Sequence, residues 1–476
     1  MANESNEVEL HGIERMCTMG ENSSYKLAMI VSIDGPIREL IPKLKTAFTS
    51  TINRHPRMRG MLVKNKLHTA YIRDYLTEDE VEKLFVISEI GESWETIVQR
   101  ECEIPFNRYE EIPYTLWVVV KNDRNAHLIL FADHFMSDGV SGAFILHDVL
   151  SAATNQPETE EHQLTTDIYK IRRTPMIRFI EKTIMKAVRP IVTNGLRKFK
   201  PIFPIAADQK PFTIPLPVNP SRGLFHSGSP ENMMAAIRRC KQEGVTVSTA
   251  MLVGVLLAVA KTKYKRLSDC PVVKVSMECA FDLRRGSEKT LELKVGAFSA
   301  ATLVPGYKNK GMNLDANFWQ ESRRAKTELG KSYFLLNFTL AFFDTYMSAG
   351  KKKYVFDKQP GCIMGDFNYS NVGKYPFPLS YKFNSETIDL GTLNAHCSAT
   401  HASSGCNLYF LSSNAFNYSM TTKYEEGISR EFFDNMIKVI ESMGTIQKDE
   451  TIREAGRRIF NENGLDDTLK DMANKR

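Results

Sequence analysis

The sequence predicts a mixed α/β (α+β) protein built as two domains or as one two-lobed unit, and three observations lead to this fold class. The chain has 476 residues, which is more than one ordinary hydrophobic core organises. Apolar runs of strand length alternate with segments whose apolar residues have helical spacing. A proline-rich stretch at 201–220 separates two halves that both contain such elements.

In the first half, the pattern predicts strands at 25–33, 117–120 and 127–132, and helices at 37–52 and 140–150. The first helix is predicted from apolar residues that share one helical face: Ile37, Leu40, Ile41, Leu44, Phe48 and Ile52. We expect Ser141 to be the N-cap of the second helix.

The second half continues the alternation. We expect helices at 231–243 and 246–264, a strand at 272–277, a hairpin at 407–412 and 417–422, and a last helix after Ser429. The predicted domain boundaries are an amino-terminal lobe at 1–165, a connector at 166–220, a carboxyl-terminal lobe at 221–445 and a charged tail at 446–476.

Composition is that of a globular protein, with 42% hydrophobic and 25% charged residues. The formal charge of +6 gives a mild preference for anionic partners such as CoA or a lipid surface, and we expect no nucleic-acid partner. Eight cysteines without a C-x-x-C pair, and a start without a secretory pattern, predict reduced thiols and a cytoplasmic protein. We also expect a monomer. The strongly apolar stretch 250–260 is too short to span a bilayer.

A histidine lies where a predicted strand meets a predicted helix. His134 follows the apolar strand 127–132, and Asp138 and Gly139 come four and five residues later, before the helix. An imidazole has an ordinary pKa near ~6.5, so it can accept a proton at neutral pH. This arrangement favours general-base chemistry, whereas a surface histidine beside an Asp-Gly turn is the plain structural alternative.

The segment 133–139 resembles the HHxxxDG signature of the CoA-dependent acyltransferases. This superfamily includes chloramphenicol acetyltransferase, peptide-synthetase condensation domains and alcohol acetyltransferases. Asp133 stands where the first histidine would be, and His134 matches the second. Further segments resemble family elements and occur in family order: 54–59, 105–118, 282–285, 295–298 and 367–373. The pattern is most similar to that of alcohol O-acetyltransferase-like members.

The resemblance implies two chloramphenicol-acetyltransferase-like lobes around an active-site tunnel. It implies transfer of an acyl group from acyl-CoA, as a co-substrate, to an acceptor hydroxyl, with His134 as the general base and no acyl-enzyme. Asp138 would support the turn by pairing with an arginine, for which Arg284 is the candidate. Gly139 would allow a close approach of the backbone.

The resemblance also points to Ser370 and Asn371 as candidates for stabilising the oxyanion or shaping the tunnel. A plain turn is the alternative for Asn371. We expect no bound cofactor or metal, although His396 and His401 lie near two cysteines. His55 is expected to cap or pack rather than to act as a base.

Two other functions stay open. The first is amide formation on an amine, with the acyl group supplied by CoA or by a carrier-protein thioester, as condensation domains do. The second is a non-catalytic member that keeps the fold as a binding or scaffold module. The joint presence of His134, Asp138 and Gly139 favours an enzyme.

The segment 170–200 holds ten basic residues and one acidic residue. Basic residues and apolar residues each recur in it at near-helical spacing. A basic amphipathic helix of this kind can lie on an anionic membrane or a lipid droplet, which would make the protein peripheral on an intracellular membrane. The alternative is a linker helix that packs on its own protein.

Overall fold

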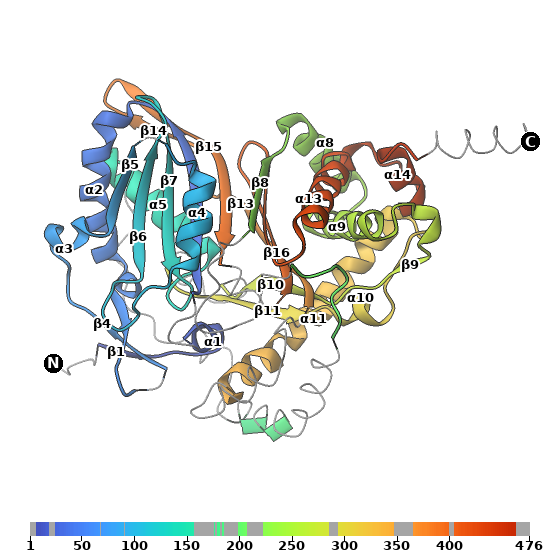
Figure 1. Cartoon of the computed structure of the whole chain (residues 1–476), viewed down its shortest axis with the longest axis horizontal. Coiled ribbons are helices and arrows are strands. Elements are labelled where there is room, and N and C mark those ends of the chain that lie inside the picture. Colours follow the sequence, from blue (N-terminus) through green and yellow to red (C-terminus); the bar gives the residue numbers. More distant parts are fainter. Residues whose placement is uncertain are drawn as a thin grey trace, which may run out of the picture.

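The computed structural model describes residues 6–18, 24–66, 68–89, 91–156, 199–206, 222–284, 294–346, 365–398 and 404–462, together with residues 176, 179, 180, 183 and 184. These residues form two lobes, and each lobe is built around a six-stranded mixed sheet (Figure 1). The predicted mixed α/β class with two lobes is therefore confirmed.

The first sheet has the strand order β14-β15-β2-β7-β6-β5. Its strands from the amino-terminal half are β2 (Lys26–Asp34), β5 (Phe85–Glu89), β6 (Tyr114–Val120) and β7 (Asn125–Asp133). β7 pairs antiparallel with β2 and β6, and β5 joins β6 in parallel. The strands predicted at 25–33, 117–120 and 127–132 are confirmed, and Lys26 lies opposite Asp133.

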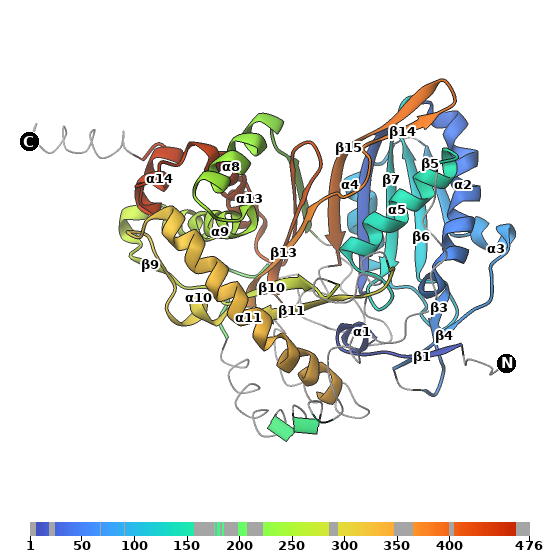
Figure 2. The same cartoon turned by 180° about the vertical axis from the view of Figure 1, so that it is seen from behind.

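Helices cover both faces of this sheet (Figures 1 and 2). α2 (Ile37–Arg54) and α5 (Gly139–Ala153) share a hydrophobic core with Met29 of β2, whereas α4 (Trp94–Glu103) packs with Ile30 on the other face. This division follows from the strand period, because successive side chains point to opposite faces.

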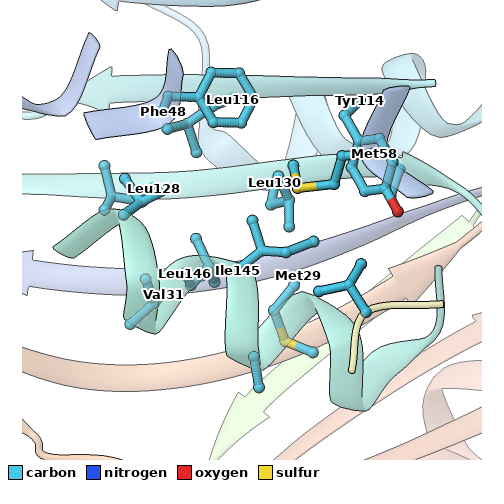
Figure 3. Close-up of a cluster of buried hydrophobic side chains, with 14 of the residues drawn as sticks. Met29, Val31, Phe48, Met58, Tyr114, Leu116, Leu128, Leu130, Ile145 and Leu146 are labelled. Carbon is cyan, nitrogen blue, oxygen red and sulfur yellow. The ribbon is translucent and has the colours of Figure 1, made fainter. Parts of the chain in front are cut away.

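The core between the sheet and its helices fixes the position of the motif. Figure 3 shows Leu128 and Leu130 of β7 in one cluster with Phe48 of α2 and with Ile145 and Leu146 of α5. Each of these side chains is at most 1% exposed. Burying such a side chain stabilises a protein by about 1.5–3 kcal/mol. This packing holds the end of β7, which carries the motif, against the helix that follows it.

Shorter elements complete the first lobe. They are β1 (Glu7–Glu9), α1 (Ile13–Cys17), the 3-10 helix η1 (Pro56–Arg59), β3 (Gly60–Leu62), β4 (Thr69–Ile72) and α3 (Glu78–Glu82). β1, β4 and β3 form a small three-stranded sheet.

A hairpin from the second half of the chain corrects the predicted lobe boundaries. β14 (Ser380–Phe383) and β15 (Glu386–Cys397) fall within 221–445, yet they join the first sheet, because β15 pairs antiparallel with β2. The physical reason is that β2 would otherwise be an edge strand with a row of unpaired backbone groups. Its partner comes from more than 350 residues away, and no local pattern shows such a pairing.

The second sheet has the order β11-β10-β13-β16-β17-β8. Its strands are β8 (Arg222–Ser227), β10 (Met277–Asp282), β11 (Ser299–Leu303), β13 (Gly365–Lys374), β16 (Ser404–Ser412) and β17 (Phe416–Thr422). The predicted hairpin is confirmed as β16 and β17. The single strand predicted at 272–277 is wrong, because β9 (Val272–Val273) pairs with β12 (Met312–Asn313), whereas β10 starts at Met277 and pairs with β11 and β13.

The second lobe holds most of the longer helices. They are α8 (Pro230–Gln242), α9 (Val247–Tyr264), α10 (Pro305–Asn309), α11 (Phe318–Tyr346), α13 (Glu426–Glu441) and α14 (Ile452–Ile459), with 3-10 helices η2 (Leu267–Asp269) and η4 (Met443–Thr445). Among the described helices, α9 alone is long and apolar enough to cross a membrane, but 72% of it is buried inside the protein. It packs against α13 and α11, so its composition is that of a core helix.

The tail predicted at 446–476 was expected to be frayed or helical; its first part is helical, but it is part of the second lobe's core and not a tail. Ile452, Ala455 and Ile459 of α14 are buried in the core of the second lobe, and so is Ile446. A capping box between Thr451 and Glu454 starts this helix. A few apolar residues at helical spacing are enough to dock it, although the segment is highly charged on average. Residues 463–476 lie outside the described part.

The end of the connector docks on the second lobe. Residues 199–206 are the last described stretch of the predicted connector at 166–220, and Ile205 forms a β-bridge with Tyr424. The carboxylate of Asp366, at the start of β13, accepts hydrogen bonds of 2.7 Å from the backbone N–H groups of Ile202 and Ser276. Asp366 thus ties the connector to the sheet.

This carboxylate predicts a pH-dependent contribution to stability. Burial raises the pKa of Asp366 from 3.8 to about 6, although the two amides oppose the shift. The folded protein holds the Asp366 proton more tightly than the unfolded chain does. The protonated carboxyl therefore adds to the free energy of unfolding below pH 3.8, and this contribution is lost as the pH rises through about 6. Asparagine does not titrate, so the wild type should lose stability relative to Asp366→Asn as the pH rises between these two values. The change should be roughly 3 kcal/mol at most. Urea unfolding of both proteins across this range measures it, and a pH-independent difference would contradict the prediction.

Candidate active site

His134 directly follows β7 and opens the turn that leads into α5. Its backbone N–H donates to the carbonyl of Tyr25 at 2.9 Å, which extends the pairing of β7 with β2 by one step. The N–H of Met136 donates to the carbonyl of Asp133 at 3.1 Å and closes the turn. His134 is half-buried, and the Nδ1 atom of its ring is buried. The strand, turn and helix predicted around this residue are confirmed.

Asp138 caps the helix that follows. Its Oδ1 atom accepts a hydrogen bond of 2.8 Å from the backbone N–H of Ser141. The prediction that Ser141 is the N-cap is therefore wrong. The carboxylate three residues earlier satisfies the orphan N–H group, and its charge is favourable beside the positive end of the helix.

Arg284 from the second lobe binds the same carboxylate. Its Nη1 and Nη2 atoms donate to the two oxygens of Asp138 at 3.0 and 3.1 Å, and both side chains are at most 3% exposed. The backbone N–H of Phe298 adds a third contact from that lobe, at 2.8 Å. The candidate partner of Asp138 thus lies directly against it. The two oxygens of Asp138 accept four hydrogen bonds in all, and three of them join the motif turn to the second lobe.

Electrostatics keep this carboxylate ionised. Burial alone would raise the pKa of Asp138, but the charge and hydrogen bonds of Arg284 more than offset it, so the pKa lies below its ordinary value. For Arg284, burial would lower the pKa, and Asp138 outweighs that effect and raises it. The pair is therefore charged throughout the physiological pH range.

Ser141 has a role that the sequence did not reveal. Its hydroxyl accepts hydrogen bonds from Nη2 of Arg284 at 2.7 Å and from the N–H of Gly296 at 3.0 Å, and it donates to the carbonyl of Gly296 at 2.8 Å. Segment 295–298 was singled out by the resemblance, but its contact with the start of α5 appears only after folding. These bonds bind the two lobes together beside His134.

Asp133, which stands in place of the first histidine of the signature, is a buried structural carboxylate. Its Oδ2 atom accepts a hydrogen bond of 2.7 Å from Nε of Arg108, and the two side chains are 1% and 3% exposed. The guanidinium of Arg108 lies 5.5 Å from the ring centroid of Tyr25, whose carbonyl accepts the His134 N–H. Oδ1 of Asp133 also accepts a hydrogen bond of 3.3 Å from the N–H of Phe135, so the pair supports the backbone on both sides of His134. The resemblance had singled out the segment 105–118 that contains Arg108, but not its contact with Asp133.

Replacing Asp133 with asparagine is expected to destabilise the protein by about 1.5–3 kcal/mol, because a charge-assisted hydrogen bond in a buried site is lost. The matched control is Asp123→Asn, which breaks an exposed ion pair with Arg38. The side chains of Arg38 and Asp123 are 77% and 75% exposed. That change should cost at most about 1 kcal/mol. Denaturant unfolding compares the two variants, and equal effects would show that burial of the Asp133 pair adds nothing.

Gly139 lies close to β13 of the second lobe. A Cβ atom on Gly139 would lie 3.3 Å from Cγ2 of Val372 on β13. The φ angle of Gly139 is not positive, so its backbone is not left-handed. The reason for a glycine here is the close approach of Val372.

Ser370 and Asn371 precede Val372 on β13, which has a register shift between Asn371 and Gly373. The alternative of a plain turn at Asn371 is therefore wrong. Ser370 is half-buried. The amide Nδ2 of Asn371 lies 3.5 Å from the hydroxyl of Tyr369, and that hydroxyl donates to the carbonyl of Ser248 at 2.8 Å.

Two other histidines, His55 and His396, have structural surroundings. Nε2 of His55 lies 2.6 Å from Oδ2 of Asp148 in α5, and both residues are buried. His396 is buried at the β15–β17 contact, and burial lowers its pKa to about 3, so it is neutral. Among the residues that the structure describes, no group of three or more His, Cys, Asp or Glu side chains could hold a metal ion. His401 lies outside them.

Comparisons with known proteins place this arrangement in a known architecture. No family model matches the chain. No curated protein matches it either. Trichothecene 15-O-acetyltransferase from Fusarium sporotrichioides is similar in structure, with a TM-score of 0.69, 12% identity and coverage of 92% of this chain and 95% of that one.

Two condensation domains are also similar. The first condensation domain of the calcium-dependent antibiotic synthetase has a TM-score of 0.64 and 10% identity, covering 95% of this chain and 99% of its own. The condensation domain of the monacolin K polyketide synthase has a TM-score of 0.61 and 9% identity, covering 94% and 99%. This chain has the fold that these proteins share. The two-lobed fold implied by the resemblance is therefore confirmed, and His134 lies beside the bonds between the lobes.

Proposed function

We propose that this protein transfers an acyl group from the thioester of an acyl-CoA to the hydroxyl of an acceptor, with His134 as the general base. The observation that carries the proposal is the histidine itself, half-buried at the end of β7, in a turn that Asp138 and Arg284 fix across the two lobes. The acetyltransferase among the similar structures supports the choice of a hydroxyl acceptor.

The proposed reaction needs one proton acceptor and no covalent enzyme intermediate. His134 takes the hydroxyl proton as the oxygen attacks the thioester carbonyl, because a free hydroxyl is a poor nucleophile at neutral pH. The tetrahedral intermediate then collapses, the carbon–sulfur bond breaks, and the imidazolium returns the proton to the CoA sulfur. The products are an ester and free CoA.

The roles of the neighbouring residues follow from their contacts. Asp138 and Arg284 would act as positioning residues, because four hydrogen bonds already occupy the Asp138 carboxylate. Ser370 and Asn371, next to the Val372 contact with the motif, remain our candidates for stabilising the oxyanion or shaping the acceptor path. Holding both substrates at one site would supply much of the acceleration.

Release of free CoA tests the proposal. The purified protein would be offered acyl-CoAs from acetyl to palmitoyl with a mixed panel of alcohols and amines, and a thiol reagent would report the free thiol. Release that depends on an alcohol is the expected result, and the preferred acyl-CoA gives the chain length. A folded protein that releases no CoA with any pair would contradict the proposal.

Amide formation is the second candidate function, because condensation domains are prominent among the similar structures. It uses the same histidine on an amine, with the acyl group carried by CoA or by a carrier protein. The discriminating experiment offers acyl groups on a carrier protein and identifies the product by mass spectrometry. An amide product with carrier-bound donors, together with no reaction of acyl-CoA with alcohols, would replace the first proposal. A scaffold role would give no product in either assay.

A further inference from the structure

Four apolar side chains in the connector point into solvent. Residues 176, 179, 180, 183 and 184 are helical, and the hydroxyl of Thr183 donates to the carbonyl of Phe179 at 2.9 Å, one helical turn earlier. Met176 and Phe179 are 70% and 72% exposed, which is more than any other large apolar side chain that the structure describes. Ile180 and Ile184 are 46% and 41% exposed.

These four side chains share one face, which we call the connector face (Met176, Phe179, Ile180 and Ile184). At 100° per residue, their spacing places them within an arc of about 140°. The short helical stretch lies apart from both sheets, at the lower edge in Figures 1 and 2. A contiguous apolar face of this kind in water is typical of a surface that binds a partner or a membrane.

The charge of the surrounding segment indicates that the partner of the connector face is anionic. The segment 170–200 that contains the connector face has ten basic residues and one acidic residue, and the whole chain has a formal charge of +6. Apolar side chains on one helical face, within a stretch of sequence rich in lysine and arginine, suit the boundary between anionic headgroups and acyl chains. A second copy of the chain is a poorer partner, because it would bring an equally basic segment against the first.

We propose that the connector face docks on the surface of an anionic phospholipid bilayer and holds the protein there as a peripheral protein. The apolar side chains enter the headgroup region, and the basic residues of the segment attract the anionic lipid. This inference is independent of the proposed acyl transfer, because it uses none of the residues of the candidate active site.

Vesicle binding of the full-length protein tests the inference. We expect sedimentation with vesicles that contain about one-third phosphatidylserine, and little with pure phosphatidylcholine. The double variant Met176→Glu/Phe179→Glu should bind the anionic vesicles at least ~10-fold more weakly. The matched control is Ile104→Glu, which places the same charge on an apolar residue that is 49% exposed in the first lobe. It should bind like the wild type.

Unfolding temperatures of the three proteins show whether each is folded. Equal binding of anionic vesicles by the wild type and the double variant would overturn the inference. A wild type that does not bind anionic vesicles would overturn it as well. A wild type that dimerises in solution through the connector face, while the double variant stays monomeric and neither binds vesicles, would identify a second copy as the partner instead.

Discussion

Replacing His134 with alanine is expected to lower kcat/KM for acyl transfer by about 10²- to 10⁴-fold, which is the usual contribution of a positioned general base. Without the imidazole, the attacking hydroxyl has no acceptor for its proton. The fold should persist, because the side chain is half-buried and belongs to a turn that Asp133 and Asp138 hold on either side. Release of CoA and thermal unfolding measure the two properties separately.

The matched control for this variant is His226→Ala, which removes an exposed imidazole on β8 of the second lobe. It should keep the activity of the wild type. Added imidazole should restore part of the activity of His134→Ala, because a small base can enter the space left by the side chain. A folded His134→Ala protein whose activity stays within about threefold of the wild type would exclude this residue as the base.

Breaking the ion pair between Asp138 and Arg284 is expected to have the largest effect on stability. Either Asp138→Ala or Arg284→Ala should lower the free energy of unfolding by about 3–5 kcal/mol, because each leaves the opposite charge buried without its partner. Both side chains are at most 3% exposed, so water cannot replace the lost contact. Activity should fall as well, since the pair holds the turn that carries His134.

A double-mutant cycle separates the pair from its surroundings. The double variant should lose less stability than the sum of the two single variants, because the second change removes the charge that the first one left unpaired. Arg38→Ala, at a pair more than 70% exposed on both sides, is the control and should cost at most about 1 kcal/mol. Additive effects at Asp138 and Arg284 would contradict a coupled buried pair.

The pair also has a defined dependence on pH. Because the folded-state pKa of Asp138 is depressed below 3.8, its contribution to stability is complete above that pH and is lost as the pH falls through the folded-state value. The stability difference between the wild type and Asp138→Ala should therefore be constant from neutral pH to about pH 5 and shrink in more acidic solution. Asp366, whose pKa is raised, changes the stability in the opposite direction over pH 4 to 6.

Local patterns in the sequence were sufficient for the motif and for a minority of the elements, whereas long elements such as α11 and β15 were not predicted. The apolar spacing of residues 37–52 predicts α2 because one face of a helix must be buried, and the apolar run before His134 predicts β7. The order of strand, turn and helix around His134 follows from residues within about 25 positions of each other. Such features depend on neighbours along the chain, so a single sequence contains them.

Features that join distant parts of the chain were decided by the tertiary structure. The resemblance offered Arg284 as the partner of Asp138, but the link from Ser141 to Gly296 and the pair of Asp133 with Arg108 had no signal in the sequence. The pairing of β15 with β2, which places a hairpin from the second half of the chain in the first lobe, also had no signal in the sequence. Sequence patterns report which side chains must be buried or charged. Which buried groups meet is determined by how two sheets and their helices pack, and that depends on the whole chain at once.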